Sequence, residues 1–186
     1  VFRDYDIRGL ANTELTTEFA HCLGKALANR AMALGEHSLI VGCDGRNSSA
    51  ELTEALEQGI LATGCHVIHL GQVPTPLLNY ATHQLSETDC GVMVTASHNP
   101  KVYNGLKALK KNGQAFDENS LKPISKLDLK NTANKGRSSQ LDLEPTYLKK
   151  IMSITAGIQL PKLRILANAC NGTAARLSTS LFKHFH

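Results

Sequence analysis

A serine beside a histidine is the most informative feature of this sequence. The pair lies in TASHNP (residues 95–100), at the end of CGVMVTA (residues 90–96), an apolar run with the composition of a buried strand. Loops that follow the strands of open α/β sheets carry ligands. Pro100 disfavours a helical conformation for Asn99, so we expect Ser97 in a loop. A serine beside an imidazole suggests nucleophilic catalysis.

A hydrolase triad is nevertheless a poor interpretation of Ser97 and His98. Neighbours in sequence rarely place an imidazole on the adjacent hydroxyl, and the chain has no GxSxG elbow. On the residues alone, an ordinary polar turn is the more economical interpretation.

Three further clusters carry charged side chains next to predicted strands. RDYDIRG (residues 3–9) alternates in sign, Asp44-Gly45-Arg46 follows a strand, and YNGLK (residues 103–107) ends ten positions beyond Ser97. We expect an Asp44–Arg46 pair to order its loop. We expect Lys107 to fold back toward Ser97 after a turn at Asn104-Gly105. Each cluster alone also fits a solvated segment.

The elements that must position these clusters alternate between strand and helix. Short apolar runs predict strands over residues 38–43, 65–70 and 90–96. Helical spacing predicts helices over residues 16–34, from Ser48 to Gly64 and over 77–84, and Ser48 with Glu51 forms a capping-box pattern. Strands separated by such helices predict a parallel α/β sheet.

The second half is less regular. A strand over residues 106–111 and a hairpin turn at Asn112-Gly113 are followed by a helix near 118–127 and a polar connecting segment over 130–144. Pro145 then begins a helix to about Gly157. A strand over 163–169, a tight turn at Asn171-Gly172 and a helix over 173–185 complete the pattern. We therefore predict one domain over residues 1–144 and the first βα unit of a second over 145–186.

Composition supports a globular protein. Hydrophobic residues make up 42% and charged residues 19% of the 186 residues, which excludes collagen-like and wholly disordered chains. No run approaches the roughly 18 apolar residues of a membrane span, and the charged opening argues against a signal peptide. The first residue is not Met, so we expect the numbering to start inside a longer chain. The five cysteines, in no CxxC pattern, are expected to be reduced core thiols of a cytoplasmic protein.

Charge is distributed unevenly along the chain. Residues 1–100 carry 5 Lys or Arg against 11 Asp or Glu, and residues 101–186 carry 15 against 5. A basic second half suits an anionic ligand, although solvated lysines explain it equally well. Aromatic residues make up only 5% and do not alternate with the lysines, so we expect no nucleic-acid partner.

Taken together, the clusters resemble the α-D-phosphohexomutases, most closely their bacterial phosphomannomutase/phosphoglucomutase branch. FRDYDIRG, CDGR, VPTP, GVMVTASHNP and YNGLK occur in the family's order along essentially the whole chain. The YDIRG opening favours this branch over the phosphoglucosamine mutases. The resemblance implies an α/β fold with a mixed, mostly parallel sheet sandwiched by helices, followed by the first βα unit of a second similar domain.

The resemblance also implies roles for individual residues. Ser97 would bear a phosphate, give it to a hexose 1- or 6-phosphate to form a bisphosphate, and take back the other phosphate. A serine ester suits such a covalent store of the phosphoryl group. Lys107 and Arg8 are similar to the family's cationic pair near the reacting hydroxyl. Tyr5, His98 and Asn99 would contact substrate or phosphate.

The implied cofactor is Mg²⁺, with glucose 1,6-bisphosphate as activator and hexose phosphates as substrates. In the family Mg²⁺ lies between the phosphoserine, here Ser97, and three aspartates of a DGDGDR-type loop. The last acidic residue of this chain is Glu144, so the three-aspartate loop is absent. We therefore expect the isolated chain to be inactive. The alternative is a non-catalytic module that binds phosphate or sugar phosphate; preference between mannose and glucose phosphates, and the oligomeric state, stay open.

Overall fold

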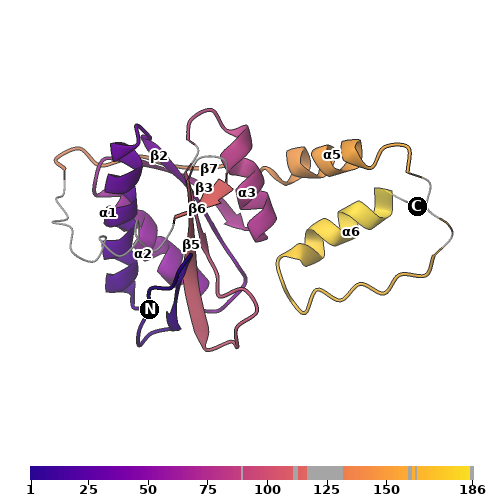
Figure 1. Cartoon of the computed structure of the whole chain (residues 1–186), viewed down its shortest axis with the longest axis horizontal. Helices are drawn as coiled ribbons and strands as arrows, with labels where there is room; N and C mark the ends of the chain where they lie inside the picture. The colour runs from indigo at the N-terminus through magenta and orange to yellow at the C-terminus, as the bar shows by residue number, and fades with distance from the viewer. Residues whose placement is uncertain (89, 111–112, 117–131, 159–160, 162, 185–186) are drawn as a thin grey trace.

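A mixed β-sheet forms the centre of the protein, in the order β1-β5-β4-β2-β3-β7, with β6 paired to β5 (Figure 1). The computed structural model describes residues 1–186 except 89, 111–112, 117–131, 159–160, 162 and 185–186. The strands are β1 (Ile7–Leu10), β2 (Ser38–Cys43), β3 (His66–Gln72), β4 (Gly91–Val94), β5 (Tyr103–Lys110), β6 (Gln114–Ala115) and β7 (Ser138–Gln140). The helices are α1 (Thr17–Ala33), α2 (Ser49–Leu61), α3 (Thr75–Gln84), α5 (Glu144–Ile154) and α6 (Ala174–His184).

Strand β5 runs against all the others. It pairs antiparallel with β1, β4 and β6, whereas β4, β2, β3 and β7 pair in parallel. Parallel pairs need a crossover connection, which α2 and α3 supply along the chain. The predicted mixed, mostly parallel sheet is confirmed.

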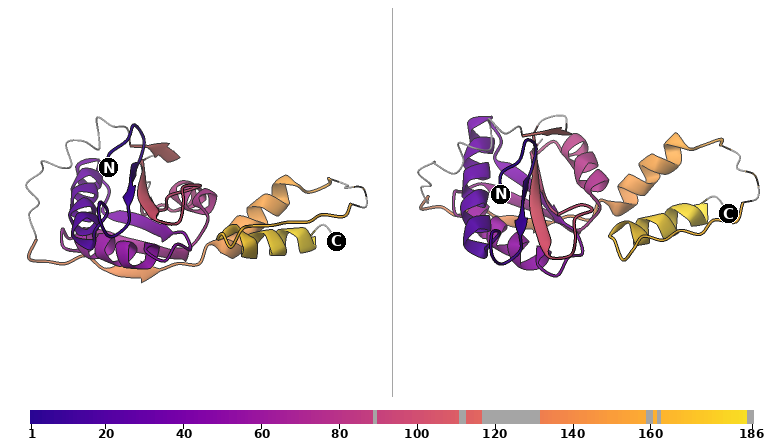
Figure 2. Two further views of the ribbon diagram at one scale, coloured as in Figure 1. Left: turned by 90° about the horizontal axis from the view of Figure 1, so that it is seen from below. Right: turned by 60° about the horizontal axis from the view of Figure 1, so that its bottom comes forward.

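Helices cover both faces of the sheet (Figures 1 and 2). Helices α1 and α2 pack together on one face, and their buried side chains share a core with apolar residues of β2 and β4. Helix α3 covers the other face, where Leu77 and Leu78 pack with Ile40 and Met93. The predicted helical layers are therefore present on both sides.

Glycines set the spacing between α1 and α2. A Cβ atom at Gly24 would overlap the carbonyl oxygen of Leu56, and one at Gly59 would overlap the carbonyl oxygen of His21. The two backbones can approach this closely only because neither position carries a side chain. This contact fixes α2 against α1.

Helices α5 and α6 lie beyond α3 and project away from the sheet (Figure 1). Tyr147 of α5 packs on Tyr80 of α3, with ring centroids 5.2 Å apart, and Leu177 of α6 joins the same core. Arg176 also pairs with Glu144 across the two helices. The predicted division into residues 1–144 and 145–186 coincides with the start of α5 and stays a prediction.

Two predicted segments differ from the structure. Residues 163–169 form no strand, and all of them except Ala169 are exposed, because no described neighbour completes a hydrogen-bond ladder with them. Conversely, the predicted connecting segment over 130–144 contains β7, which gains a strand conformation by pairing with β3 despite its polar sequence. The helix predicted near 118–127 lies outside the described residues.

Three predictions from local sequence signals also differ from the structure. The Ser48 side chain does not cap α2, because its hydroxyl instead accepts a hydrogen bond from Asn104. Asn104-Gly105 is not a turn but lies within β5. The tight turn predicted at Asn171-Gly172 is centred one residue earlier, on Cys170 and Asn171, which both have positive φ.

The cysteines divide into two groups. Cys43, Cys65 and Cys90 are buried as predicted, whereas Cys22 and Cys170 are exposed, so the prediction of core thiols is wrong for these two. Burial raises the pKa of the Cys43 thiol, and it raises the pKa of the Cys65 thiol to about 11. These buried thiols therefore stay protonated and unreactive near neutral pH. Among the described helices, none has the length and apolar composition to cross a membrane.

Candidate functional site

Ser97 lies where the chain leaves β4. Its φ of 56° is in the left-handed region, which is uncommon for residues other than glycine. The Ser97 amide donates to Thr95 Oγ1 at 2.8 Å. Ser97 Oγ lies 3.5 Å from His98 Nδ1, and both side chains are exposed. This separation is at the outer limit of a hydrogen bond, so the two residues do not form a tight nucleophile–base pair.

Arg46 holds the loop that contains Ser97, which we call the serine loop (residues 95–103). Arg46 Nη2 donates to the carbonyl oxygens of Ser97 and Asn99 at 2.9 and 2.7 Å. Its Nη1 donates to the carbonyls of Pro100 and Tyr103 at 2.9 and 3.1 Å. One guanidinium thus binds four carbonyls of the serine loop.

Asp44 holds Arg46 in turn. Its carboxylate accepts from Arg46 Nε at 3.1 Å, from the Arg46 amide at 3.0 Å and from Ser49 Oγ at 2.6 Å. It also accepts from Thr95 Oγ1 at 2.8 Å, which links it to the first residue of the serine loop. The predicted Asp44–Arg46 pair therefore exists, and it orders the serine loop in addition to its own.

A second arginine approaches the serine loop from β1. Arg8 Nη1 donates to the carbonyl oxygen of Ala96, and Arg8 Nε and Nη2 donate to Asp6 Oδ2 at 3.1 and 3.0 Å. The same carboxylate oxygen accepts from Lys107 Nζ at 3.1 Å. Asp6 thus joins Arg8 and Lys107, two of the predicted catalytic residues, in one cluster.

Sheet register explains why Arg8 and Lys107 meet. Arg8 is paired with Gly105, and Lys107 lies two positions further along β5, so both side chains belong to the same face of the sheet. A Cβ atom at Gly105 would overlap the Ile7 carbonyl oxygen and lie 2.9 Å from Arg8 Cδ. Gly105 therefore leaves the space through which the Arg8 side chain passes.

Asn104 anchors the far end of the serine loop. Its side chain is fully buried and donates to Ser48 Oγ and Ser49 Oγ at 2.8 and 3.0 Å, while its Oδ1 accepts from the Gly105 amide. Together with Asp44, it connects β5 to the start of α2. This buried network fixes the distance between the two segments.

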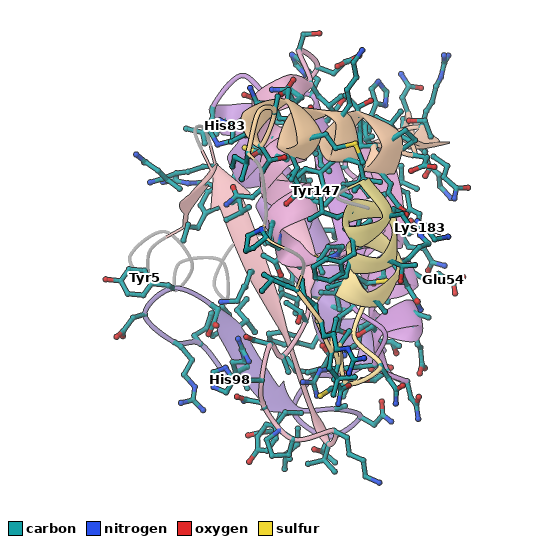
Figure 3. The ribbon with its side chains drawn as sticks, turned by 90° about the vertical axis from the view of Figure 1, so that its right-hand side faces the viewer. Tyr5, Glu54, His83, His98, Tyr147 and Lys183 are labelled. Atoms are coloured by element: carbon teal, nitrogen blue, oxygen red, sulfur yellow. The ribbon has the colours of Figure 1, made fainter. Side chains whose placement is uncertain are left out.

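The predicted substrate contacts are less closely grouped. Asn99 contributes its carbonyl to Arg46, and no described residue hydrogen-bonds its side chain. His98 is exposed beside Ser97. Tyr5 is 67% exposed, and Figure 3 shows its ring projecting outward from the loop before β1, away from His98. The structure thus brings Ser97, His98, Asn99, Arg8 and Lys107 to one edge of the sheet but leaves Tyr5 outside these contacts.

The sequence reasoning missed several members of this arrangement. Asp6, Thr95 and Asn104 lie in the quoted motifs but were given no role. Polar residues directly after a strand, or a charged residue flanked by basic ones, are the signals that could have identified them. Their function depends on partners 51 to 101 positions away, which no local pattern reveals.

An open cavity of about 610 Å³ borders the serine loop. Ser97, Asn99 and Lys101 line one side, and Arg46 and Thr75 line another. The turn centred on Cys170 and Asn171 covers part of it. The cavity is large enough for a small polar ligand.

The described residues do not fit a magnesium site by themselves. They contain no group of three or more His, Cys, Asp or Glu side chains arranged to hold a metal ion. The carboxylates nearest to the serine loop, Asp44 and Asp6, are occupied by four and three hydrogen bonds respectively. Mg²⁺ prefers free oxygen ligands, and Ser97 would contribute only one through a phosphate.

Comparison with known proteins gives consistent matches. The family model described as phosphoglucomutase/phosphomannomutase, alpha/beta/alpha domain I, matches residues 1–135. A phosphomannomutase/phosphoglucomutase of Pseudomonas aeruginosa is 37% identical over 98% of this chain, and a phosphoglucosamine mutase of Clostridioides difficile is 36% identical over 95% of it. These alignments cover 39% and 41% of the relatives, so the chain spans about two fifths of their length.

A solved structure agrees with these matches. A phosphoglucomutase/phosphomannomutase family protein of Burkholderia thailandensis superposes with a TM-score of 0.87 at 34% identity. The superposition covers 100% of this chain and 42% of that protein.

Proposed function

Because the chain belongs to the phosphoglucomutase/phosphomannomutase family, we propose that it supplies the phosphoserine loop of an enzyme that interconverts hexose 1-phosphates and hexose 6-phosphates. The family resemblance drawn from the motifs is confirmed by the match over residues 1–135. Ser97 is the residue that carries the phosphoryl group in this proposal.

The proposal rests on the backbone conformation and the contacts of Ser97. Its backbone is kept in a left-handed conformation at the end of β4, with its hydroxyl exposed and its carbonyl held by Arg46. Strain of this kind persists only where surrounding contacts determine the conformation, and it is concentrated at functional sites. An ordinary polar turn would not need two arginines directed at its backbone.

The proposed reaction proceeds in two transfers. A hydroxyl of a hexose phosphate attacks the phosphorus of phospho-Ser97, the bond between phosphorus and Ser97 Oγ breaks, and a hexose bisphosphate forms. The bisphosphate then turns, Ser97 Oγ attacks its other phosphoryl group, and the isomeric hexose monophosphate leaves. In each transfer the attacking hydroxyl gives up a proton and the leaving oxygen gains one, so neither transfer changes the net number of protons.

Arg8 and Lys107 are suited to the charge that develops in these transfers. Phosphoryl transfer depends mainly on positioning and on stabilising charge on the phosphoryl oxygens. Arg8 is fixed against the Ala96 carbonyl, next to Ser97, and Asp6 holds Lys107 beside it. We assign proton transfer and charge stabilisation to Lys107, and anion binding to Arg8. His98 and Asn99 would contact the phosphate, and Tyr5 would reach substrate only after a change in the conformation shown here.

Phosphate mapping tests the assignment of Ser97. The full-length protein is incubated with glucose 1,6-bisphosphate, and phosphopeptides are identified by mass spectrometry. We expect phosphate on Ser97 in the wild type and in the matched control Ser86→Ala, and none in Ser97→Ala. Phosphate retained by Ser97→Ala would refute the assignment.

A kinetic test addresses Lys107. In the full-length enzyme we expect Lys107→Ala to lower turnover by roughly 10²-fold, the scale of a lost acid–base or charge-stabilising group. Lys107→Arg should recover little of the lost turnover, because a planar guanidinium does not replace a compact ammonium paired with Asp6. Lys150→Ala, on the exposed part of α5, is the control. A Lys107→Ala enzyme within twofold of wild type would contradict the role.

A binding module is the second candidate, and the distribution of carboxylates favours it for residues 1–186 taken alone. No Asp or Glu follows Glu144, and the carboxylates at the serine loop are occupied. We expect residues 1–186 to show no mutase turnover with glucose 1-phosphate, Mg²⁺ and bisphosphate activator. Turnover proportional to the concentration of these residues would contradict this expectation.

A further inference from the structure

We propose that Arg46 is a positioning residue for phosphoryl transfer: it orients the backbone around Ser97 and does not itself bind the phosphate. This inference rests on the proposed function of Ser97 as the phosphate carrier. It assigns to a residue of the β2–α2 connection a role in setting the direction of the peptide group that follows Ser97.

The number of donors separates a positioning role from a binding role. An arginine has five N–H donors. In Arg46 the Nε donor binds Asp44, and the four Nη donors bind four different carbonyls of the serine loop. All five donors are therefore occupied, and the guanidinium has none left for a phosphate.

Arg8 provides the contrast within the same site. Three of its donors are engaged, two by Asp6 and one by the Ala96 carbonyl. Within the described chain the other two have no acceptor. Arg8 can thus receive an anion, whereas Arg46 can do so only by releasing the serine loop.

The carbonyls that Arg46 binds determine where the neighbouring amides point. A trans peptide group directs its C=O and N–H in opposite directions, and the described chain contains no cis peptide. Since the Ser97 carbonyl is bound to Arg46, the His98 amide points away from the guanidinium. The Pro100 carbonyl fixes the Lys101 amide in the same way.

The two amides so directed are available to an anion. No hydrogen bond from the His98 or Lys101 amide to another described residue is present, although the neighbouring Asn99 and Tyr103 amides are bonded within the loop. A backbone amide adjacent to a residue in the left-handed conformation is a typical anion-binding group. Arg46 thus prepares an unbonded N–H next to Ser97, where a phosphate would accept it.

The test compares Arg46→Lys with the matched variant Arg30→Lys, on the exposed surface of α1. Lysine keeps the charge but cannot bind four carbonyls and a carboxylate. In the full-length protein we measure the initial rate of Ser97 phosphorylation by glucose 1,6-bisphosphate, and kcat and KM of the mutase reaction. We expect Arg46→Lys to lower the phosphorylation rate and kcat by about 10²-fold, the scale of a small misplacement of reacting groups. KM should change less than twofold.

Two readouts separate positioning from general loss of structure. Amide hydrogen exchange at Asn99 and Tyr103, whose bonds lie inside the serine loop, should become at least tenfold faster in Arg46→Lys, while exchange in the α1 core stays unchanged. In Arg46→Ala, added methylguanidine should restore phosphorylation at least tenfold. If Arg46→Ala does not fold, the phosphorylation rate and the loop exchange of Asp44→Asn are measured without added methylguanidine, because this isosteric change weakens the hold on Arg46.

The outcomes distinguish the two proposals. The positioning role would be overturned if Arg46→Lys were phosphorylated at a rate within twofold of the wild-type rate. It would also be overturned if phosphorylation were slower but amide exchange in the serine loop were not faster. Wild-type protein that accepts no phosphate would refute the proposed function instead. In that case hydrogen exchange still tests whether Arg46 orders the serine loop. Unchanged exchange at Asn99 and Tyr103 in Arg46→Lys would refute that ordering role as well.

Discussion

Two irregular segments of this protein behave in opposite ways. The serine loop over residues 95–103 is polar, yet its carbonyls are held by Arg46 and Arg8. The described residues of 155–173 include an apolar, strand-like run, yet Leu163, Ile165 and Leu166 are 52, 52 and 97% exposed. The polar segment therefore has more partners for its backbone than the apolar segment has.

The difference shows what gives an irregular segment a defined conformation. Backbone groups need hydrogen-bond partners, and in the serine loop distant side chains supply them. A strand obtains its partners from neighbouring strands, and none of the described strands lies beside residues 163–169. An apolar pattern without that neighbour leaves its side chains in solvent.

The largest loss of stability among these tests is expected for Gly105→Ala. The new Cβ would overlap the Ile7 carbonyl oxygen and lie 2.9 Å from the Thr95 carbonyl oxygen, so β1, β5 and β4 must separate. We expect the free energy of unfolding to fall by about 3 kcal/mol. Gly157→Ala, with open space around it but a φ of 83°, should cost about 1 kcal/mol. Urea denaturation measures the free energy of unfolding of both variants. Equal losses in the two would contradict the packing argument.

Asn104→Ala is expected to have the next largest effect. Asn104 is fully buried and bonded to Ser48, Ser49 and the Gly105 amide, so its removal leaves that buried amide unpaired. We expect a loss of about 2 kcal/mol. The control is Asn168→Ala, since among the described residues the Asn168 side chain is bonded only to the exposed Cys170 amide. Thermal unfolding should separate the two variants, and a change in Asn104→Ala below about 0.5 kcal/mol would contradict the prediction.

A stabilising change is expected at Ser97. Glycine adopts positive φ without strain, so Ser97→Gly should raise the free energy of unfolding by up to about 1 kcal/mol while removing the proposed phosphate acceptor. Stability gained together with loss of phosphorylation would indicate that the loop holds Ser97 at a cost in stability. A clear loss of stability in denaturant titration would instead show that the serine side chain supports the fold.

The smallest effect is expected in the 155–173 segment. Leu166 is 97% exposed, so Leu166→Ser should change the free energy of unfolding of this chain by less than about 0.5 kcal/mol. Leu106→Ser, at a position 1% exposed in β5, serves as the contrast and should cost about 3 kcal/mol or more. Chemical denaturation measures both. A large loss in Leu166→Ser would mean that the residue is packed in solution.

Sequence patterns predicted the elements that have local causes. The buried strand over residues 38–43, the helix predicted over residues 16–34 and the helix begun near Pro145 follow from runs, spacing and a proline that involve only neighbouring residues. The order of motifs also identified the family and singled out Ser97, Lys107 and Arg8. These conclusions needed no knowledge of which segments meet in space.

Tertiary structure alone decided how the site is built. Arg46 looked like one half of a local pair, and only the approach of β4 to β2 brought it to the carbonyls of residues 97–103. Asp6 became the link between Arg8 and Lys107 because β1 pairs with β5. Pairing of distant segments also turned the polar residues 138–140 into a strand and left the apolar residues 163–169 without one. Local preferences are weak, and the partners available in space determine which of them is realised.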